Sequence, residues 1–317
     1  MSVTIVLELG SHSLKVHYQS RTSGIFRKSR FPWNLGHEVY SQGRISVATT
    51  RRAIDTIRLL RKNGIEASSV LAIATGALRD AANRQKFLAR LEEKLDLQVR
   101  VISGREEASL LAQGYLSTCD KLPALITDIG GGSLELVYLG QDKTILRDSL
   151  PLGAIRVYHF GQRRDGTFDE DLVSGWIENS FQDASVIQAN EIHCTGGTAK
   201  AIAKVTKKRT VDLTDLRNLE DRVRKEGPPK HLKIDRARVL FPGLVVLRKL
   251  MEHSNAQKLT YLKVRIGRIF LQKYARRVPG RGDPLRKQHL LRDLRITQIY
   301  TRNSQVGIRV DEEQGPE

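Results

Sequence analysis

Glycine, serine and threonine residues cluster at three places in the sequence, in a pattern that suits phosphate binding. Glycine lets the backbone approach a ligand closely and take a positive φ, and successive N–H groups of such a turn form an anion-binding nest. Serine and threonine hydroxyls add further donors. The residues expected to bind phosphate are Gly10, Ser11, His12 and Ser13 in the first cluster, Gly130, Gly131, Gly132 and Ser133 in the second, and Gly196, Gly197 and Thr198 in the third.

Four carboxylates accompany these clusters. Asp128 directly precedes the second cluster and Glu135 follows it, while Glu8 occupies in the first cluster the position that Asp128 has in the second. Glu107 begins a predicted helix. Phosphate hydrolysis needs an oriented water and a charge neutraliser, usually Mg²⁺ held by one or two carboxylates and substrate oxygens. We expect Glu8 and Asp128 to be Mg²⁺ ligands, and Asp128 and Glu135 to act on the metal and the water. Taken singly, each acid would more often be a surface or capping residue.

Two further residues carry alternatives. Arg79 lies near a predicted junction of strand and helix, where a guanidinium clamps a phosphate bidentately or forms an ion pair with a neighbouring acid. His193 precedes the third cluster, and we interpret it as a packed histidine rather than a catalyst.

The pattern of apolar residues predicts an α/β protein with a duplicated core. Residues 3–9 and 14–18 read as two strands around the first cluster, and 123–127 and 134–138 repeat that arrangement around the second. Helices are expected at 47–60, 81–95, 104–114, 199–205, 212–225 and 236–251. The repeat indicates two domains with a cleft between them, residues 1–120 and 121–275, followed by a basic extension at 276–317 whose last residues are expected to be disordered.

The net charge of +18 is typical of a protein with a polyanionic partner, namely nucleic acid, a membrane surface or polyphosphate; charge alone leaves a merely solvated basic surface as an equal alternative. Ten Lys or Arg residues fall between positions 273 and 309, but the chain has few aromatic residues, so base stacking on nucleic acid is not favoured. No apolar run approaches the roughly 20 residues that span a bilayer. Two cysteines at no metal-ligand spacing, Cys119 and Cys194, and the lack of a signal peptide predict a cytoplasmic protein with small thiols in its core.

The chain resembles the exopolyphosphatase / guanosine-pentaphosphate phosphohydrolase family of the actin-like ATPase superfamily. The resemblance spans roughly residues 3 to 270. Its motifs are the segments 10–13, 74–83, 102–108, 128–135, 150–154 and 196–199.

This resemblance implies two actin-like (ribonuclease H-like) domains and Mg²⁺-assisted release of a terminal phosphate from inorganic polyphosphate or from guanosine pentaphosphate. It implies that Glu107 positions the attacking water, that Asp128 and Glu135 surround the metal and water, and that Arg79 contacts phosphate. By analogy with such families it also implies a homodimer. A sugar kinase is the alternative from the superfamily fold alone, and the segment Ser103-Gly104-Arg105-Glu106-Glu107-Ala108 argues against it.

Three positions depart from the family pattern. The first motif has Glu8 where the family has Asp and His12 where it has Asn, and Ile266 stands in Arg-Ile-Gly where the family has Arg-Glu-Gly. Glutamate is one methylene longer than aspartate, so a metal or its waters would have to move, and His12 would make the site sensitive to pH near 6.5. The departures leave open an ordinary enzyme, a slow one, or a non-catalytic protein that binds polyphosphate or nucleotide.

Overall fold

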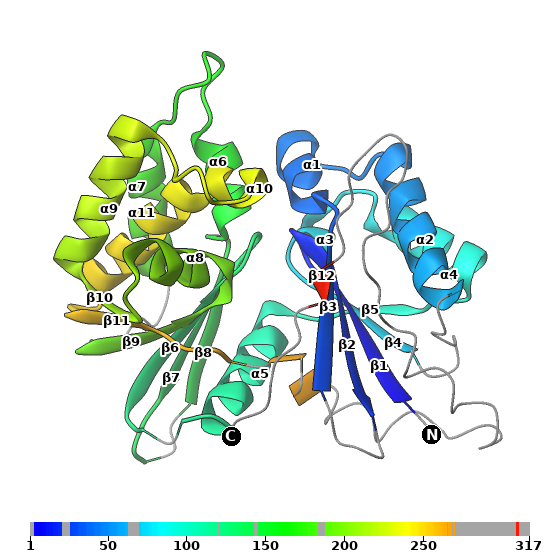
Figure 1. Ribbon diagram of the computed structural model, residues 1–317, viewed down its shortest axis with the longest axis horizontal. Coiled ribbons are helices and arrows are strands. Elements are labelled where there is room, and N and C mark those ends of the chain that lie inside the picture. Colours follow the sequence, from blue (N-terminus) through cyan, green and yellow to red (C-terminus); the bar gives the residue numbers. More distant parts are fainter. Residues whose placement is uncertain are drawn as a thin grey trace. The chain divides into compact units, whose positions relative to one another are not determined.

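The computed structural model describes residues 3–20, 26–62, 70–119, 121–142, 145–182, 188–264, 266–267, 269–270 and 309–310 of the 317. The chain divides into two compact units. Unit 1 comprises Met1–Ile102 and Gly267–Glu317, and unit 2 comprises Ser103–Ile266. Each unit holds one β-sheet with helices packed on it (Figure 1).

The sheet of unit 1 has the strand order β12-β3-β2-β1-β4-β5. Its strands are β1 (Val3–Leu9), β2 (Ser13–Ser20), β3 (Phe26–Pro32), β4 (Val70–Ala74), β5 (Val99–Val101) and β12 (Arg309–Val310). Strands β1, β2 and β3 form an antiparallel meander, and β4 and β5 run parallel to β1.

The sheet of unit 2 repeats this order as β10-β11-β9-β6-β7-β8. Its strands are β6 (Ala124–Ile129), β7 (Leu134–Leu139), β8 (Ile145–Leu150), β9 (Glu191–Thr195), β10 (Thr210–Asp212) and β11 (Lys258–Tyr261). Here β6, β7 and β8 are antiparallel, and β9 and β11 continue parallel to β6. Five strands correspond when the second order is read in reverse, β1 to β6, β2 to β7, β3 to β8, β4 to β9 and β5 to β11, whereas β12 and β10 have no counterpart among the strands that the structure describes. The predicted duplication is confirmed, and each unit is an actin-like α/β domain.

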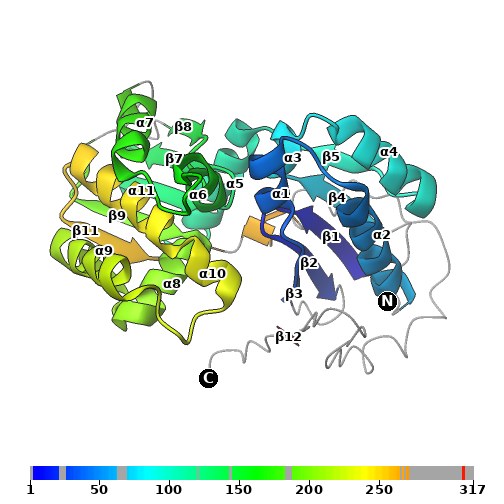
Figure 2. The same ribbon diagram turned by 90° about the horizontal axis from the view of Figure 1, so that it is seen from above.

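Unit 1 builds its core where the sheet meets its helices. These are α1 (Leu35–Gln42), α2 (Val47–Lys62), α3 (Ala77–Asp80) and α4 (Arg84–Leu95). Alternate residues of β1, such as Leu7 and Leu9, are buried with Phe87 and Leu91 of α4. Helices α2 and α4 lie side by side (Figure 2). The helix predicted at 81–95 begins at Arg84, because Ala81 is extended, with ψ 121°, and separates α4 from α3.

Unit 2 has a larger helical layer. Its helices are α5 (Gly104–Leu116), α6 (Ala154–Gly161), α7 (Glu170–Gln182), α8 (Gly196–Thr206), α9 (Leu213–Glu226), α10 (Ile234–Arg238) and α11 (Leu240–His253). The mostly buried α11 packs against α6, α7, α8 and α9. The single helix predicted at 236–251 is two helices in the structure, α10 and α11, which are separated at Val239. Among the described residues, no helix is both long and apolar enough to cross a membrane.

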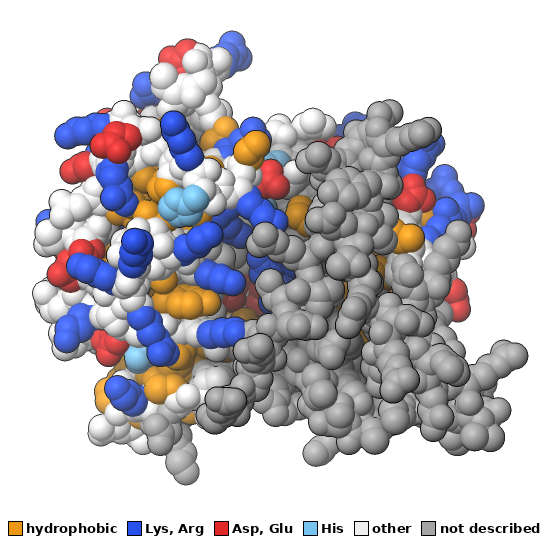
Figure 3. All heavy atoms as spheres, in the orientation of Figure 1, with side chains coloured by type: hydrophobic (Ala, Val, Ile, Leu, Met, Phe, Trp, Pro, Cys, Tyr) orange, Lys and Arg blue, Asp and Glu red, His pale blue; other side chains and the backbone are white. Residues whose placement is uncertain are grey.

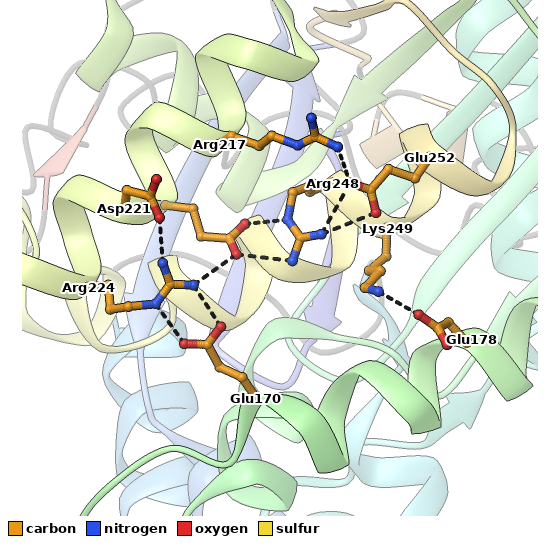
Figure 4. A network of polar contacts seen from close by, with 9 residues as sticks. Glu170, Glu178, Arg217, Asp221, Arg224, Arg248, Lys249 and Glu252 are labelled. Carbon is orange, nitrogen blue, oxygen red and sulfur yellow. Dashed lines mark hydrogen bonds and ion pairs between the residues drawn. The ribbon is translucent and has the colours of Figure 1, made fainter.

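Ion pairs tie α7, α9 and α11 together at the surface of this layer (Figure 4). Arg248 donates to both carboxylate oxygens of Glu220, at 2.7 and 3.1 Å, and Arg224 donates to both oxygens of Glu170, at 2.8 and 2.7 Å. Burial alone would lower the pKa of Arg248, but its hydrogen bonds and the charge of Glu220 outweigh burial and raise that pKa. The buried Glu220 therefore keeps a permanent cationic partner.

The boundary between the units lies earlier than the predicted one at 120/121. It follows Ile102, because α5 packs on the sheet of unit 2. Leu111 and Tyr115 of α5 share an apolar cluster with Ile126 of β6 and Val137 of β7. The predicted basic extension at 276–317 lies outside the described residues, apart from β12. Cys194 is buried as expected, whereas Cys119 is half-buried.

Candidate functional site

The first glycine turn, Gly10 to Ser13, joins β1 to β2 and is closed by a hydrogen bond from Gly10 N to Ser13 O of 3.2 Å. The segment after β3 takes up its carbonyl groups. Trp33 Nε1 donates to Gly10 O at 2.7 Å, Gly36 N donates to Ser11 O at 2.6 Å, and Trp33 N donates to His12 O at 3.4 Å. The carbonyl oxygens of Gly10, Ser11 and His12 therefore all accept hydrogen bonds from the segment that follows β3.

The second turn, Gly130 to Ser133, is built in the same way between β6 and β7. Gly130 N donates to Ser133 O at 3.0 Å. Its carbonyls accept from the start of α6: Ala154 N donates to Gly130 O at 3.0 Å and Ile155 N to Gly131 O at 3.0 Å. Arg156 adds a bond from its side-chain Nε to Gly132 O of 2.8 Å.

The use of these carbonyls decides where the N–H groups of both turns point. In a planar trans peptide the N–H is directed opposite to the C=O of the same unit. The N–H groups of residues 11 to 13 therefore point away from the segment after β3, and those of residues 131 to 133 point away from α6. Each turn presents three successive N–H groups on one side, which is the geometry of an anion nest.

Gly153 sets the approach of α6 to the second turn. A Cβ at this position would lie 2.3 Å from Gly132 C and 2.3 Å from Ser133 N. A side chain here would push α6 off the turn, and the carbonyl bonds described above would be lost. The motif 150–154, which entered the sequence analysis only through the family resemblance, thus has a physical role in shaping the turn.

The third cluster directly follows β9 and forms the first turn of α8. Gly196 has φ +97°, and a Cβ there would lie 2.4 Å from Asp128 Oδ1, so Asp128 lies directly against the N-terminus of α8. Gly197 lies against the guanidinium of Arg236 in α10, since a Cβ at position 197 would lie 2.4 Å from Arg236 Nη2. Thr198 is buried, and its side chain lies against Gly243 of α11.

Arg236 is a candidate phosphate contact that the sequence analysis missed. It lies nearly forty residues beyond the cluster in sequence and belongs to no recognisable motif, so no local signal pointed to it. The fold brings it to Gly197 because α10 packs on α8.

The predicted acids of unit 2 lie along one row of the sheet and beside the start of α5. Asp128 pairs with Glu135 across β6 and β7, and Glu135 pairs with Ser149 across β7 and β8. Glu135 is buried and accepts a 3.0 Å hydrogen bond from Ser149 Oγ. Gly104 allows α5 to start against this serine, since a Cβ there would lie 2.3 Å from Ser149 Oγ.

Glu107 is placed by the start of α5. Ser103 caps the helix by accepting a hydrogen bond from Glu106 N at 3.1 Å, and Glu107 N donates to Ser103 O at 3.0 Å. Glu107 is half-buried in the first turns of this helix, which contacts β7 and β8. Unit 2 therefore brings together the second and third clusters, Asp128 and Glu135, with Glu107 on the adjoining helix.

Arg79 and His193 are placed as follows. Arg79, half-buried in α3 of unit 1, donates to Ile102 O at 3.3 Å. His193 is buried in β9, and its ring packs against that of Tyr115 with centroids 5.2 Å apart and the ring planes tilted by 45°. Burial lowers the pKa of His193.

Glu8 is engaged by two partners on β2. Lys15 Nζ donates to Glu8 Oε1, and His17 Nε2 lies 2.9 Å from Glu8 Oε2. Burial alone would raise the pKa of Glu8, but the charge of Lys15 and the hydrogen bond from His17 outweigh burial and hold that pKa well below its usual range. The carboxylate is thus ionised and already bonded through both oxygens.

The two predicted metal ligands, Glu8 and Asp128, differ in whether they could bind a divalent cation. Glu8 does not fit as a metal ligand, because Lys15 and His17 use both of its oxygens. Asp128 is a half-buried carboxylate at the end of a strand and fits the way Mg²⁺ binds phosphate substrates, through one or two carboxylates and phosphate oxygens. Among the residues that the structure describes, no group of three or more His, Cys, Asp or Glu side chains is arranged to hold a metal without a substrate.

Several solved structures share this fold. An exopolyphosphatase-like protein aligns with a TM-score of 0.73 at 20% identity, covering 88% of this chain and 100% of its own. An exopolyphosphatase from Cytophaga hutchinsonii aligns with a TM-score of 0.68 at 19% identity, covering 88% and 99%. The Ppx/GppA family member of Aquifex aeolicus aligns with a TM-score of 0.62 at 21% identity, covering 88% and 100%.

These similarities concern the fold, because each identity is low. The family model of the Ppx/GppA phosphatases, however, matches residues 18–266 of the sequence itself. That match contains the second and third glycine clusters, Glu107, Asp128 and Glu135. The chain therefore belongs to the Ppx/GppA phosphatase family.

Proposed function

We propose that this chain is a Mg²⁺-dependent phosphohydrolase that releases terminal orthophosphate from inorganic polyphosphate, with Glu107 positioning the attacking water. The observation that carries the proposal is the arrangement of unit 2. There the second turn presents its N–H groups on one side, and the Asp128–Glu135–Ser149 row meets the helix that bears Glu107.

The reaction follows from these groups. The oxygen of a water attacks the terminal phosphorus, and the bond from that phosphorus to the bridging oxygen breaks. The polyphosphate leaves one phosphate shorter and keeps the bridging oxygen. Glu107 orients the water and takes up its proton, while Glu135, held by Ser149, keeps its carboxylate in a fixed position. The N–H groups of the turns bind phosphate oxygens, and catalysis of this kind rests on positioning and electrostatics.

The Mg²⁺ requirement is part of the proposal. When bound, Mg²⁺ neutralises charge on the phosphate oxygens. Asp128 would hold it, with the remaining ligands supplied by the substrate and water. Arg236 and Arg79 are proposed to bind phosphate oxygens as permanent cations.

Polyphosphate is favoured as the substrate by a basic groove on unit 2. A cavity of about 550 Å³ at the C-terminal end of α8 is lined by Ala203, Lys204, Lys207, Lys208, Arg209, Tyr261 and Lys263. Five of these seven residues are Lys or Arg and none is acidic. Figure 3 shows Lys and Arg side chains gathered over this part of unit 2. A long polyanion gains more from such a groove than a compact nucleotide does, by contacts that weaken with salt.

The test is orthophosphate release from long-chain polyphosphate, with Mg²⁺ and with Mg²⁺ removed by chelation. We expect release that depends on Mg²⁺ and that falls in Glu107→Gln. Guanosine pentaphosphate is the second candidate substrate, since the same groups would act on it. In a competition assay, preferential hydrolysis of guanosine pentaphosphate would overturn the choice of polyphosphate while leaving the reaction type intact.

A non-catalytic protein that binds polyphosphate or nucleotide is the third candidate, and the pairing of Glu8 with Lys15 and His17 favours it. This function predicts binding of polyphosphate without release of orthophosphate. Saturable binding combined with no release under any divalent cation would replace the hydrolase proposal with this one.

A further inference from the structure

The two sheets carry equivalent polar rows beside their glycine turns, but the rows differ in charge. Each row runs across the three antiparallel strands at the position two residues before the first glycine. The row of unit 1 is Glu8, Lys15 and Arg30, and the row of unit 2 is Asp128, Glu135 and Ser149. The formal charge of the first row is +1 and that of the second is −2. Equivalent strand positions therefore hold a cationic row in unit 1 and an anionic row in unit 2.

The cationic row is a built arrangement rather than a surface ion pair. Glu8 is 8% exposed and His17 is 1% exposed. Lys15 lies directly across the strand pair from Glu8, and His17, two residues further along β2, bonds the other carboxylate oxygen. Gly267 leaves the space for this histidine, since a Cβ there would lie 2.0 Å from His17 Nδ1.

Other positive groups reinforce the row. Lys28 lies opposite His17 on β3, and its charge acts on both Glu8 and His17. A divalent cation bound to Glu8 would therefore be repelled by the positive charges of Lys15 and Lys28. Mg²⁺ binds oxygen at about 2.0–2.1 Å and demands near-octahedral geometry, so it would have to displace Lys15 from the same oxygen.

We infer that the Lys15 ammonium takes the place of a divalent cation beside the first turn, so that Glu8 binds no metal and divalent-cation binding is confined to unit 2. The inference deepens the proposed function at its first turn and rests on it only for the role of the metal. Lys15 is a positioning residue here. It fixes Glu8 and supplies positive charge near the N–H groups that we propose bind phosphate.

The experiment is a titration with Mn²⁺ in the absence of phosphate and substrate. Electron paramagnetic resonance measures the concentration of free Mn²⁺ at each step, and the bound fraction follows from it. The full chain is compared with Glu8→Gln, Lys15→Gln, Lys15→Arg and the double variant Glu8→Gln/Lys15→Gln. We expect Glu8→Gln and Lys15→Arg to bind Mn²⁺ as the parent chain does. Lys15→Gln should gain one site, because it removes the ammonium that is bonded to Glu8 Oε1, and the double variant should lose that site again.

Two outcomes would overturn the inference: a Glu8→Gln variant that binds Mn²⁺ at least tenfold more weakly than the parent, or a folded Lys15→Gln variant that gains no site. Circular dichroism checks the fold of each variant. If Lys15→Gln does not fold, the comparison of the parent with Glu8→Gln decides alone. Asp128→Asn, which should weaken the parent site, tests the proposed metal ligand separately. A chain that releases no orthophosphate would sink the proposed function and leave this titration unaffected.

Discussion

Lys15 in β2 and Glu135 in β7 occupy equivalent positions in the two repeats. Lys15 lies across the strand pair from Glu8, and Glu135 lies across from Asp128. Opposite charges in such positions stabilise a strand pair, and like charges destabilise it. Both turns are closed by the same backbone hydrogen bond, from Gly10 N to Ser13 O and from Gly130 N to Ser133 O, so the charges beside them are a main difference between the repeats. This difference in charge is the basis of our proposal that a divalent cation binds in unit 2 and not beside Glu8.

Glu107→Gln is expected to lower the kcat of orthophosphate release by roughly 10²–10⁴-fold, the range for loss of a general base. The amide keeps the size of the side chain but cannot take a proton from water. Glu106→Gln, at the neighbouring position of α5, is the matched control and should retain activity within a few fold. Equal loss in both variants would point to a disturbed helix start rather than to the role of Glu107.

Gly153→Ala should disrupt the second turn, because its Cβ would lie 2.3 Å from backbone atoms of residues 132 and 133. We expect a loss of stability of about 1–3 kcal/mol, as for overpacking, together with a loss of kcat/KM. Gly175→Ala is the control, since a Cβ in that helical position meets nothing within 4 Å. It should stabilise the protein by up to about 1 kcal/mol. Denaturant unfolding and the release assay measure both effects.

Removing charge from the basic groove should weaken the binding of long polyphosphate. The triple variant Lys204→Gln/Lys207→Gln/Lys263→Gln is expected to raise KM about tenfold at low salt and to make KM less dependent on salt. The control is Lys225→Gln/Lys230→Gln/Lys233→Gln, which removes the same charge from exposed positions outside the groove. Identical shifts in both triple variants would mean that net charge, and not the groove, governs binding.

Arg248→Met should destabilise the chain by about 3–5 kcal/mol, because it leaves the buried Glu220 without this bidentate partner. Lys249→Met is the neighbouring control. Its partner Glu178 is 55% exposed, and an exposed pair of this kind is worth about 0–1 kcal/mol. Chemical denaturation of both variants gives the comparison, and a small effect for Arg248→Met would show that the network in Figure 4 adds little stability.

The buried His193 predicts a loss of stability in mild acid. Burial lowers the pKa of His193 below its ordinary value of 6.5, so the unfolded chain binds more protons than the folded chain just below that pH. Its contribution to stability is complete above pH 6.5 and is lost as the pH falls, by up to about 1.4 kcal/mol per pH unit for one proton. His193→Phe keeps a ring beside Tyr115 and should flatten this slope, measured by urea unfolding from pH 7.5 to 5. The exposed His231→Gln should leave the slope unchanged.

Much of this protein could be predicted because its signals are local. A short apolar run predicted the first strand of each repeat, alternating apolar residues predicted the second, and glycine clusters predicted the turns between them. The predicted helices beginning at 47 and at 104 start at those residues in the structure. Strand β3 and helices α1, α6 and α7 were not predicted. In unit 1, β3 carries four successive polar residues, Arg27 to Arg30, so no apolar run marks it.

The sequence by itself determined the family, the duplicated α/β architecture and the position of the glycine turns, because short motifs and backbone requirements of glycine are written in neighbouring residues. Only the tertiary structure decided which side chains meet across strands and helices. Strand register placed Lys15 on Glu8 and Ser149 on Glu135, helix packing brought Arg236 to Gly197, and the apolar face of α5 moved the boundary to Ile102. Such contacts join residues far apart in the chain, and their free energy depends on burial and distance, which the order of residues does not record.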